Sequence, residues 1–342
     1  MKLKVCVLWI FVISVSSCAQ SSRKSIFDCI YDTEGIPTIQ LVTDWQALFS
    51  QKSEEAEDYI PAKLTIPVNG VSTTFEVKVR ARGMMRKQAC TFPPLKIDFK
   101  KKELKKNQLD TSISKLKLVF QCGQGNANYE LLLKEKLGYD LYKVIAPKYH
   151  LEYKELTTEA IQNGKLNYTL HAMIVEDEHH LEKRTGSMLV TDSLMKSSQL
   201  DRTTYLRMST FEYMIGNTDW TVPNRHNVEM YKSDDYAKIV PVAYDFDYSG
   251  LVNAPYASPH PRIPIKSVTD RFFMGTGVTD EEAISMGKYF LEKKPDFDKV
   301  IVSQQQLSDS TKQSVVRYFD EFYAICKDET KAKSEFKFKG LK

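Results

Sequence analysis

A group of acids and amides in the second half of the chain has the chemistry of phosphoryl transfer. Asp219 is followed by Asn224 and Asn227, and a strand-like run then ends in Asp245-Phe246-Asp247. Phosphoryl transfer needs one carboxylate that faces the attacking hydroxyl, and an amide with a second carboxylate that hold Mg²⁺ against the phosphates. The order of these residues therefore favours a phosphoryl-transfer site in which Asp219 is the catalytic group.

The metal ligands are less narrowly defined. Asp245 follows a strand-like run, where a carboxylate can meet a magnesium ion that bridges two phosphates, and Asp247 lies beside it. Asn224 stands five residues after Asp219, the separation between the base and the metal-binding Asn of a kinase catalytic loop. Asn227 is a competing ligand. Each residue alone is commoner in turns and caps, so the hypothesis depends on their joint order.

The first half of the chain supplies candidates for the cation that binds the phosphates. Lys96 is the lone lysine of the apolar run 94–99, and Glu135 lies on a predicted helix further along. We expect a Lys96–Glu135 pair to hold the α and β phosphates of a nucleotide. Lys117 is the alternative cation, but it alternates with Lys115 as a surface lysine does. A solvent-facing position for both charges is the competing interpretation.

Two arginines and a glutamate complete the candidate cofactor contacts. Arg82 and Arg86 flank a predicted loop that contains Gly83, and arginine forks match phosphate geometry. A single glycine is no phosphate-binding fingerprint, and arginines on a strand face are usually solvated. Glu176 ends a strand-like run and is interpreted as a cleft carboxylate or a hinge residue.

Hydrophobic periodicity divides the chain into a β-rich and a helical part. Apolar and polar residues alternate from Ala62 onward, with a strong hairpin signal at Asn69-Gly70, and one helix is predicted from 128 to 145. Helical spacing dominates beyond residue 180. We therefore expect a tether and lead-in at 19–59, a β-rich lobe at 60–180 and a helical lobe at 181–342, which fits a two-lobed α+β protein with a cleft.

The composition is that of an ordinary globular protein and argues against nucleic acid as a partner. The 342 residues are 42% hydrophobic and 27% charged, with a formal net charge of +4. A nucleic-acid binder would carry a denser basic patch.

Residues 1–18 have the features of an export signal. Lys2 and Lys4 precede an apolar core at 5–15, which is shorter than the roughly 20 residues of a membrane span. The core leads to Cys18 in a sequence that resembles a bacterial lipobox, in which the cysteine becomes lipidated. An ordinary signal peptide cleaved near Gln20 is the alternative. We expect an exported lipoprotein, anchored to a membrane in the periplasm or at the cell surface.

Export makes disulfides the expected state of the remaining cysteines. Cys29, Cys90, Cys122 and Cys326 allow three pairings, and no pair has the spacing of a metal-binding motif. Cys90 and Cys122 flank predicted strands of one sheet, which favours a Cys90–Cys122 bond. The pair Cys29–Cys326 would then tie the two ends of the chain.

The whole pattern resembles the CotH family of atypical, exported kinases over roughly residues 60–260. The pieces that carry the resemblance are short motifs in a fixed order: Arg80-Ala-Arg-Gly83, the strand with Lys96, Leu116-Lys-Leu118, Leu132-Leu-Lys-Glu135, Glu176, and Asp219…His226-Asn227…Asp245-Phe-Asp247. The sequence departs from the family where Met84-Met85-Arg86 replaces a Gly-rich loop.

The resemblance implies a protein-kinase-like two-lobed fold and a transfer of the ATP γ-phosphoryl group to protein hydroxyls, with Mg²⁺ or Mn²⁺. It maps phosphate pairing onto Lys96 and Glu135, catalysis onto Asp219, and metal ligation onto Asp245 with Asn224 or Asn227. Two other functions stay open. One is a catalytically silent binding or structural lipoprotein, and the other is a metal-dependent phosphoesterase built on Asp245, Asp247 and His226.

Overall fold

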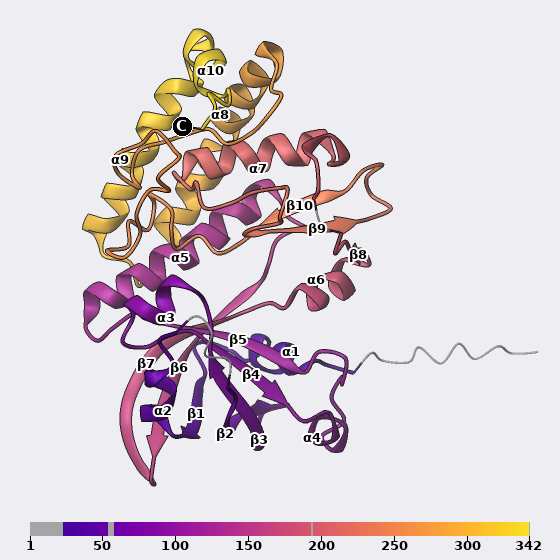
Figure 1. Cartoon of the computed structure of the whole chain (residues 1–342), viewed down its shortest axis with the longest axis vertical. Coiled ribbons are helices and arrows are strands. Elements are labelled where there is room, and N and C mark those ends of the chain that lie inside the picture. The colour runs from indigo at the N-terminus through magenta and orange to yellow at the C-terminus, as the bar shows by residue number, and fades with distance from the viewer. Residues whose placement is uncertain (1–22, 54–57, 193, 342) are drawn as a thin grey trace, which may run out of the picture.

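A computed structural model describes residues 23–53, 58–192 and 194–341. The expected signal segment at 1–18 and the lipidation site Cys18 lie outside the described residues. A β-barrel forms one side of the molecule and a group of helices the other (Figure 1).

The strands of the first half close into a barrel. Within the described residues it has seven strands in the order β1-β2-β3-β4-β5-β7-β6, and β1 pairs with β6 in parallel. Asn69-Gly70 and Asn163-Gly164 form the tight turns of two hairpins, each with positive φ. The strands are β1 (Thr38–Thr43), β2 (Ile60–Val68), β3 (Val71–Ala81), β4 (Leu95–Phe99), β5 (Lys115–Phe120), β6 (Tyr153–Gln162) and β7 (Lys165–Val175).

Alternating side chains fill the barrel. Phe75, Val77 and Val79 of β3 are buried, whereas Glu76 and Lys78 between them are exposed. Successive residues of a strand point to opposite faces, so the apolar set faces inward and the charged set outward. Lys117 on the outward face of β5 pairs with Glu178 of the helical part at 2.6 Å.

Helices α1 (Ile26–Tyr31) and α2 (Trp45–Ser50) belong to the same core as the barrel. Ser25 caps α1, and the buried Phe27 and Trp45 pack with the inward strand residues. The expectation of a tether and lead-in at 19–59 was therefore wrong for its described residues, because α1, β1 and α2 are structural parts of the barrel.

The helical part has its own core. Long helix α5 (Asn126–Ile145) lies beside α7 and α8 and buries Leu133, Leu137 and Leu141 in that core. A small sheet of β8, β9 and β10 packs next to α7. The elements are α6 (Glu178–Thr185), β8 (Met188–Leu189), a 3₁₀ turn (Ser197–Gln199), α7 (Arg202–Met214), β9 (Val228–Lys232), β10 (Val240–Ala243), α8 (Asp280–Ser303), α9 (Asp309–Cys326) and α10 (Glu329–Glu335). Two short helices, α3 (Met85–Ala89) and α4 (Lys101–Lys106), connect barrel strands.

The predicted two-lobed protein-kinase-like fold was wrong. The strands close on themselves as a barrel instead of forming an open lobe, because β1 joins β2 on one side and β6 on the other. The sequence analysis had placed β1 in the lead-in. Parallel pairing between strands more than a hundred residues apart leaves no local signal in the sequence.

The disulfide Cys90–Cys122 is confirmed. It joins the end of α3 to the residues after β5. The Cys29–Cys326 pair was wrong, because both cysteines are buried as free thiols. Cys29 lies in the core of the barrel and Cys326 in the core of the helical part, so the two packed cores keep them apart. Among the described helices, none combines the length and the apolar character needed to cross a lipid bilayer.

Replacing both Cys90 and Cys122 with alanine should lower the free energy of unfolding by about 2–4 kcal/mol, since the bond constrains the unfolded chain. Chemical denaturation of the oxidised protein measures this. Reductant should lower the free energy of unfolding of the wild type by a similar amount and leave that of the double variant unchanged. A Cys326→Ala protein that keeps the full response to reductant is the control. A wild type whose denaturation midpoint ignores reductant would contradict the assignment.

Candidate functional site

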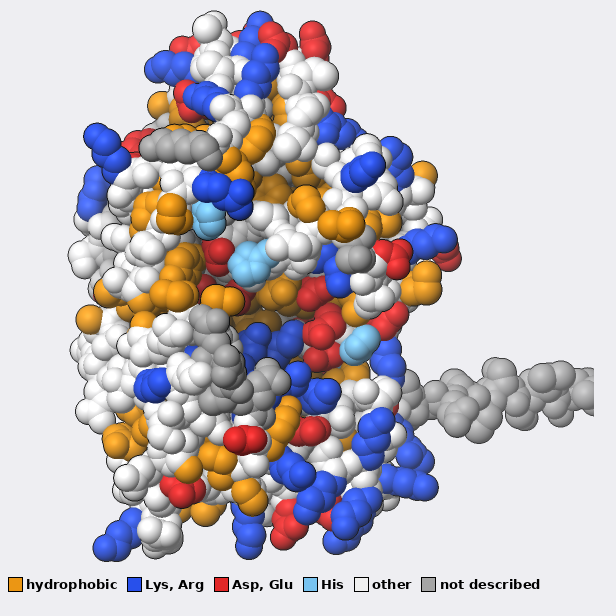
Figure 2. Space-filling model, in the orientation of Figure 1, with side chains coloured by type: hydrophobic (Ala, Val, Ile, Leu, Met, Phe, Trp, Pro, Cys, Tyr) orange, Lys and Arg blue, Asp and Glu red, His pale blue; other side chains and the backbone are white. Residues whose placement is uncertain are grey.

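A cavity of about 190 Å³ lies between the barrel and the helical part. On the face shown in Figure 2, the surface is hollowed there, with Lys and Arg side chains on the barrel side and Asp and Glu side chains on the helical side. The lining residues come from the loop after β3, from α3, from the residue before β4, from β5, and from the segments that follow α7 and β10: Arg82, Gly83, Met84, Met85, Arg86, Pro94, Val119, Asp219, His226, Asn227, Asp245, Asp247 and Tyr248.

Asp219 is held in the loop that follows α7. The helix ends at Met214. At Gly216, just beyond it, φ is +68° and a Cβ would come within 2.1 Å of the Tyr318 hydroxyl, so only glycine fits. The Asp219 N–H then donates to Asn217 Oδ1 at 3.0 Å. His226 Nε2 lies 3.0 Å from Asp219 Oδ1, and Asn227 Nδ2 donates to Oδ2 at 3.0 Å. The carboxylate is thus fixed from both sides at the cavity wall.

The structure distinguishes the two candidate amides. Asn227 is buried, lines the cavity and also donates to the Asp219 carbonyl at 2.7 Å. Asn224 is exposed, does not line the cavity, and accepts a hydrogen bond from Thr221 in its own turn. The spacing of five residues in the sequence was therefore a poor guide here, because the chain turns back between Thr221 and His226.

Asp245 lines the cavity in a strained backbone conformation. Its φ is +63°, a left-handed value that costs a non-glycine residue about 1–3 kcal/mol. The Asp245 N–H donates to the Tyr139 hydroxyl at 3.1 Å, so a side chain from α5 supports this conformation. Residues held in such conformations by their surroundings cluster at functional sites, where the strain directs a side chain.

A buried arginine connects three parts of the site. Arg86 Nη1 of α3 lies 2.8 Å from Glu135 Oε2 of α5, and Arg86 Nε lies 3.5 Å from Asp247 Oδ2. The Tyr256 hydroxyl donates to Asp247 at 2.9 Å, and the Arg86 guanidinium lies over the Tyr256 ring. All three charged side chains are at least nine-tenths buried.

The excess of acid over base around Arg86 raises two pKa values. Burial raises the pKa of Glu135 to about 7, although the charge of Arg86 acts in the opposite direction. Burial and then the charge of Asp245 raise the pKa of Asp247 well above its usual range. Asp247 was predicted as a metal ligand, but its carboxyl is engaged with Tyr256 and Arg86. Its structural setting is that of a group that positions Arg86.

The predicted partner of Glu135 was wrong. Glu135 pairs with Arg86, whereas Lys96 lies in β4 between Arg80 and Lys117 of the neighbouring strands. Lys96 is on the outward face, two residues from the cavity residue Pro94. Burial and then the neighbouring positive charges lower the pKa of Lys96. Among the described residues, neither Lys96 nor Arg82 of the cavity wall has an ion-pair partner.

Glu176 was predicted to be a cleft carboxylate or a hinge residue, and it does not line the cavity. It is fully buried, accepts the Glu152 N–H at 2.8 Å, and pairs with Arg184 Nε at 2.8 Å and with His180 Nδ1 at 2.5 Å. His180 Nε2 in turn lies 2.8 Å from Asp28 of α1. This cluster fastens α6 and α1 to the end of β7, so Glu176 has a structural role.

Tyr139, Tyr256 and His226 are site residues that the sequence analysis did not select for the phosphoryl-transfer site. The two tyrosines come from α5 and from the loop after Asp247, and no spacing pattern marks them. His226 had a signal, because it directly precedes Asn227. Its hydrogen bond with Asp219 raises the pKa of His226.

The arrangement can hold a phosphorylated anion against an oxygen-rich wall. Within the part of the chain that the structure describes, no three His, Cys, Asp or Glu side chains form a ready metal cluster. Magnesium in phosphoryl-transfer sites commonly has only one or two carboxylate ligands, and substrate phosphates and water supply the rest. Comparison of the chain with protein-family models and with curated proteins gave no match.

Arg86→Gln should lower the free energy of unfolding by about 3–5 kcal/mol, because it leaves Glu135 and Asp247 buried without their cation. Arg82→Gln is the matched control, since Arg82 lines the same cavity without an ion-pair partner among the described residues. Its effect should stay within about 0.5 kcal/mol. Urea denaturation of both variants measures the difference, and equal effects would contradict the structural role of Arg86.

The cluster around Glu176 should make stability depend on pH. Burial alone would lower the pKa of His180, but its bonds to Asp28 and Glu176 outweigh burial and raise the pKa to about 9. The unfolded value is about 6.5. The stabilisation is therefore fully present below pH 6.5 and is lost as the pH rises through 9.

His180→Asn should consequently destabilise the protein more at pH 6 than at pH 10, as measured by denaturation at both values. His179→Asn, at an exposed neighbouring position, is the control and should stay within about 0.5 kcal/mol throughout. A His180→Asn effect that is the same at both pH values would refute the assignment.

Proposed function

We propose that this chain transfers the γ-phosphoryl group of ATP to a hydroxyl group of a protein substrate, with a divalent metal. The proposal keeps the function implied by the resemblance to the CotH kinases and does not depend on the kinase-like fold. The observation that carries it is that Asp219, Asn227 and Asp245 line one cavity together with Arg82. These residues come from segments separated by more than a hundred positions, and their chemistry is that of phosphoryl transfer.

Asp219 is the group proposed to receive the substrate hydroxyl. Each of its carboxylate oxygens accepts one hydrogen bond, from His226 or from Asn227, which leaves lone pairs on both oxygens for a hydroxyl proton. Because both neighbours hold the carboxylate in one orientation, the hydroxyl would be aligned before transfer, which is the main contribution a protein makes to this reaction.

The barrel side of the cavity is proposed to bind the phosphates. Arg82 lines the cavity, and Lys96 lies next to it on the same outward face. Neither cation has an ion-pair partner among the described residues, so both charges are available to an anion. Arg86 is already neutralised by Glu135 and is proposed to fix the loop that carries Arg82.

Asp245 and Asn227 fit a hard divalent cation. Both offer oxygen ligands in the cavity, and the Asn227 amide nitrogen donates to Asp219, which leaves the amide oxygen available. The Tyr139 contact and the left-handed backbone at Asp245 hold this carboxylate in place. Mg²⁺ or Mn²⁺ bound there would neutralise charge on the phosphate oxygens.

We further propose that the protein acts outside the cytoplasm, as a lipoprotein anchored through Cys18. The Cys90–Cys122 disulfide supports an oxidising compartment. A catalytically silent binding protein would share the same features, and a nucleotide-binding measurement separates the two. The phosphoesterase alternative is weaker, because two of the side chains it needs are already hydrogen-bonded within the protein. His226 is hydrogen-bonded to Asp219, and Asp247 to Tyr256.

Asp219→Asn should reduce ATP-dependent labelling of a protein substrate by about 10²–10⁴-fold, because the hydroxyl loses its proton acceptor. Binding of Mg²⁺–ATP, measured by its thermal shift, should persist. Asn227→Ala should weaken that shift in a metal-dependent manner. Asn224→Ala is the matched control and should change neither measurement, since Asn224 lies outside the cavity.

The proposal fails if the wild type shows neither nucleotide-induced stabilisation nor labelling with Mg²⁺ or Mn²⁺. Nucleotide binding without labelling of any protein, including autophosphorylation, would support the silent binding protein. Hydrolysis of phosphate monoesters that does not require ATP would support the phosphoesterase.

A further inference from the structure

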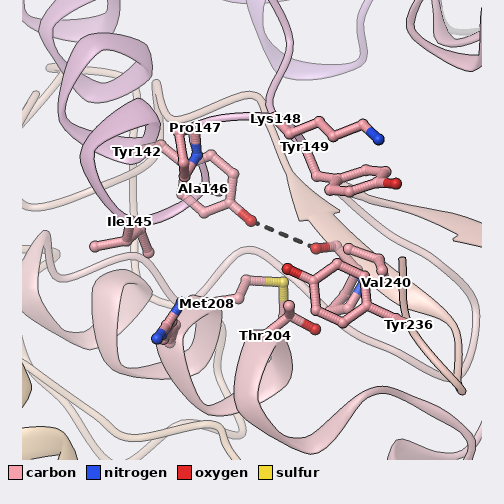
Figure 3. A pocket seen from close by; sticks show the side chains of 12 residues that line it. Tyr142, Ile145, Ala146, Pro147, Lys148, Tyr149, Thr204, Met208, Tyr236 and Val240 are labelled. Atoms are coloured by element: carbon pink, nitrogen blue, oxygen red, sulfur yellow. Dashed lines mark hydrogen bonds between the residues drawn. The ribbon is translucent and has the colours of Figure 1, made fainter. Parts of the chain in front are cut away.

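We propose that a second pocket, behind the Asp245 segment, binds a small aromatic carboxylate. The pocket has a volume of about 130 Å³ and lies among the end of α5, the loop that follows it, α7 and β10. It shares no lining residue with the candidate phosphoryl-transfer site. Figure 3 shows its walls, with Tyr142 and Ile145 on one side and Tyr149 and Tyr236 on the other.

The walls of the pocket suit a single flat ring. Tyr149 and Tyr236 meet edge to face at 5.8 Å, and Met208 and Val240 supply an apolar floor. A dry apolar cavity of about 150 Å³ binds benzene. The pocket is slightly smaller but opens to solvent, so it has room for one ring whose substituents lie at the opening. Aromatic walls favour stacked or edge-on contacts with such a ring.

The polar groups at the pocket set the charge of its ligand. Lys148 is already paired with Asp235, and its amine points out of the pocket (Figure 3). Arg207 has no ion-pair partner among the described residues, and its Nε is buried without a hydrogen-bond partner. The Arg207 guanidinium is held over the Tyr289 ring at 4.4 Å. Because Nε is buried, the two Nη atoms of this unpaired guanidinium form the fork that matches one carboxylate, which accepts two parallel hydrogen bonds from them.

The pocket is in contact with the segment that carries Asp245. The Tyr142 hydroxyl forms hydrogen bonds with the two ends of β10: it accepts the Ala243 N–H at 3.3 Å and donates to the Pro241 carbonyl at 3.5 Å. The Tyr142 ring also packs against Phe246, which follows Asp245 directly. A ligand against Tyr142 and Val240 would therefore stabilise the strand that leads into Asp245. Binding of a ligand in this pocket does not depend on the proposed function. Only the effect of that binding on catalysis at Asp245 rests on it.

The test uses 4-fluorobenzoate as the probe, followed by ¹⁹F NMR without nucleotide. We expect binding at about millimolar concentration or tighter, the range of a fragment of this size. The neutral isostere 4-fluorobenzamide should bind at least about tenfold more weakly, because it lacks the charge that Arg207 would meet. Bound probe should also slow hydrogen exchange of the Ala243 amide, which donates to Tyr142.

Arg207→Gln should weaken probe binding by about tenfold or more, and Lys148→Gln is the matched control that should leave it unchanged. Arg207→Lys keeps the charge but loses the fork, so its affinity for the probe should fall between that of the wild type and that of Arg207→Gln. It serves as the second variant if Arg207→Gln does not fold. Equal binding of the benzoate and the benzamide, or unchanged binding in both Arg207 variants, would overturn the proposal, as would no binding by the wild type. Asp219→Asn should bind the probe normally, so failure of the phosphoryl-transfer proposal would leave this result intact.

Discussion

The structure of the site depends on one buried cation, Arg86, which is shared by two buried acids. Glu135 comes from α5, Asp247 follows the Asp245 segment, and Arg86 itself sits on the short helix between β3 and β4. A buried charge is tolerated only when it is paired and hydrogen-bonded, so these three elements must meet in one arrangement. Burial raises the pKa of Glu135 and of Asp247, and the single positive charge of Arg86 offsets this only in part.

This ion cluster explains why a cavity exists at the boundary between two separate hydrophobic cores. Apolar packing holds the barrel and the helical part internally, but the cores themselves do not place Arg82 opposite Asp219. The Cys90–Cys122 bond fixes α3 to the end of β5, and Arg86 then fixes α3 to α5 and to the Asp247 segment. The Glu176 cluster in the same way fixes α1 and α6 to the end of β7. Polar cross-links thus determine the geometry that the hydrophobic effect, which is non-directional, cannot specify.

The sequence could identify the acidic half of the site and the arginines Arg82 and Arg86, but not the pairing of Arg86 with Glu135. Asp219, Asn227 and Asp245 lie within one short stretch, so their order carries information about their arrangement, and alternation predicted most strands of the barrel. The partner of Glu135 depends instead on a helix of five residues whose direction is set by a disulfide and by packing. From residue type alone, Lys96 and Arg86 are equally plausible partners of Glu135. Closure of the barrel likewise depends on the parallel pairing of β1 with β6. The local alternation of apolar and polar residues does not predict which strands pair.

The contrast between paired and unpaired cations separates structural charges from those available to a ligand. Arg86 and Arg184 are paired with buried carboxylates, and removing either would leave an acid without its partner. Arg82, Lys96 and Arg207 have no such acid among the described residues, yet each is held at the wall of a cavity or beside one. Burial and then the like charges of its neighbours lower the pKa of Lys96, and holding this unneutralised cation beside them opposes folding. Under the proposed function, a phosphate bound there would remove this repulsion and offset what the arrangement costs the unliganded protein.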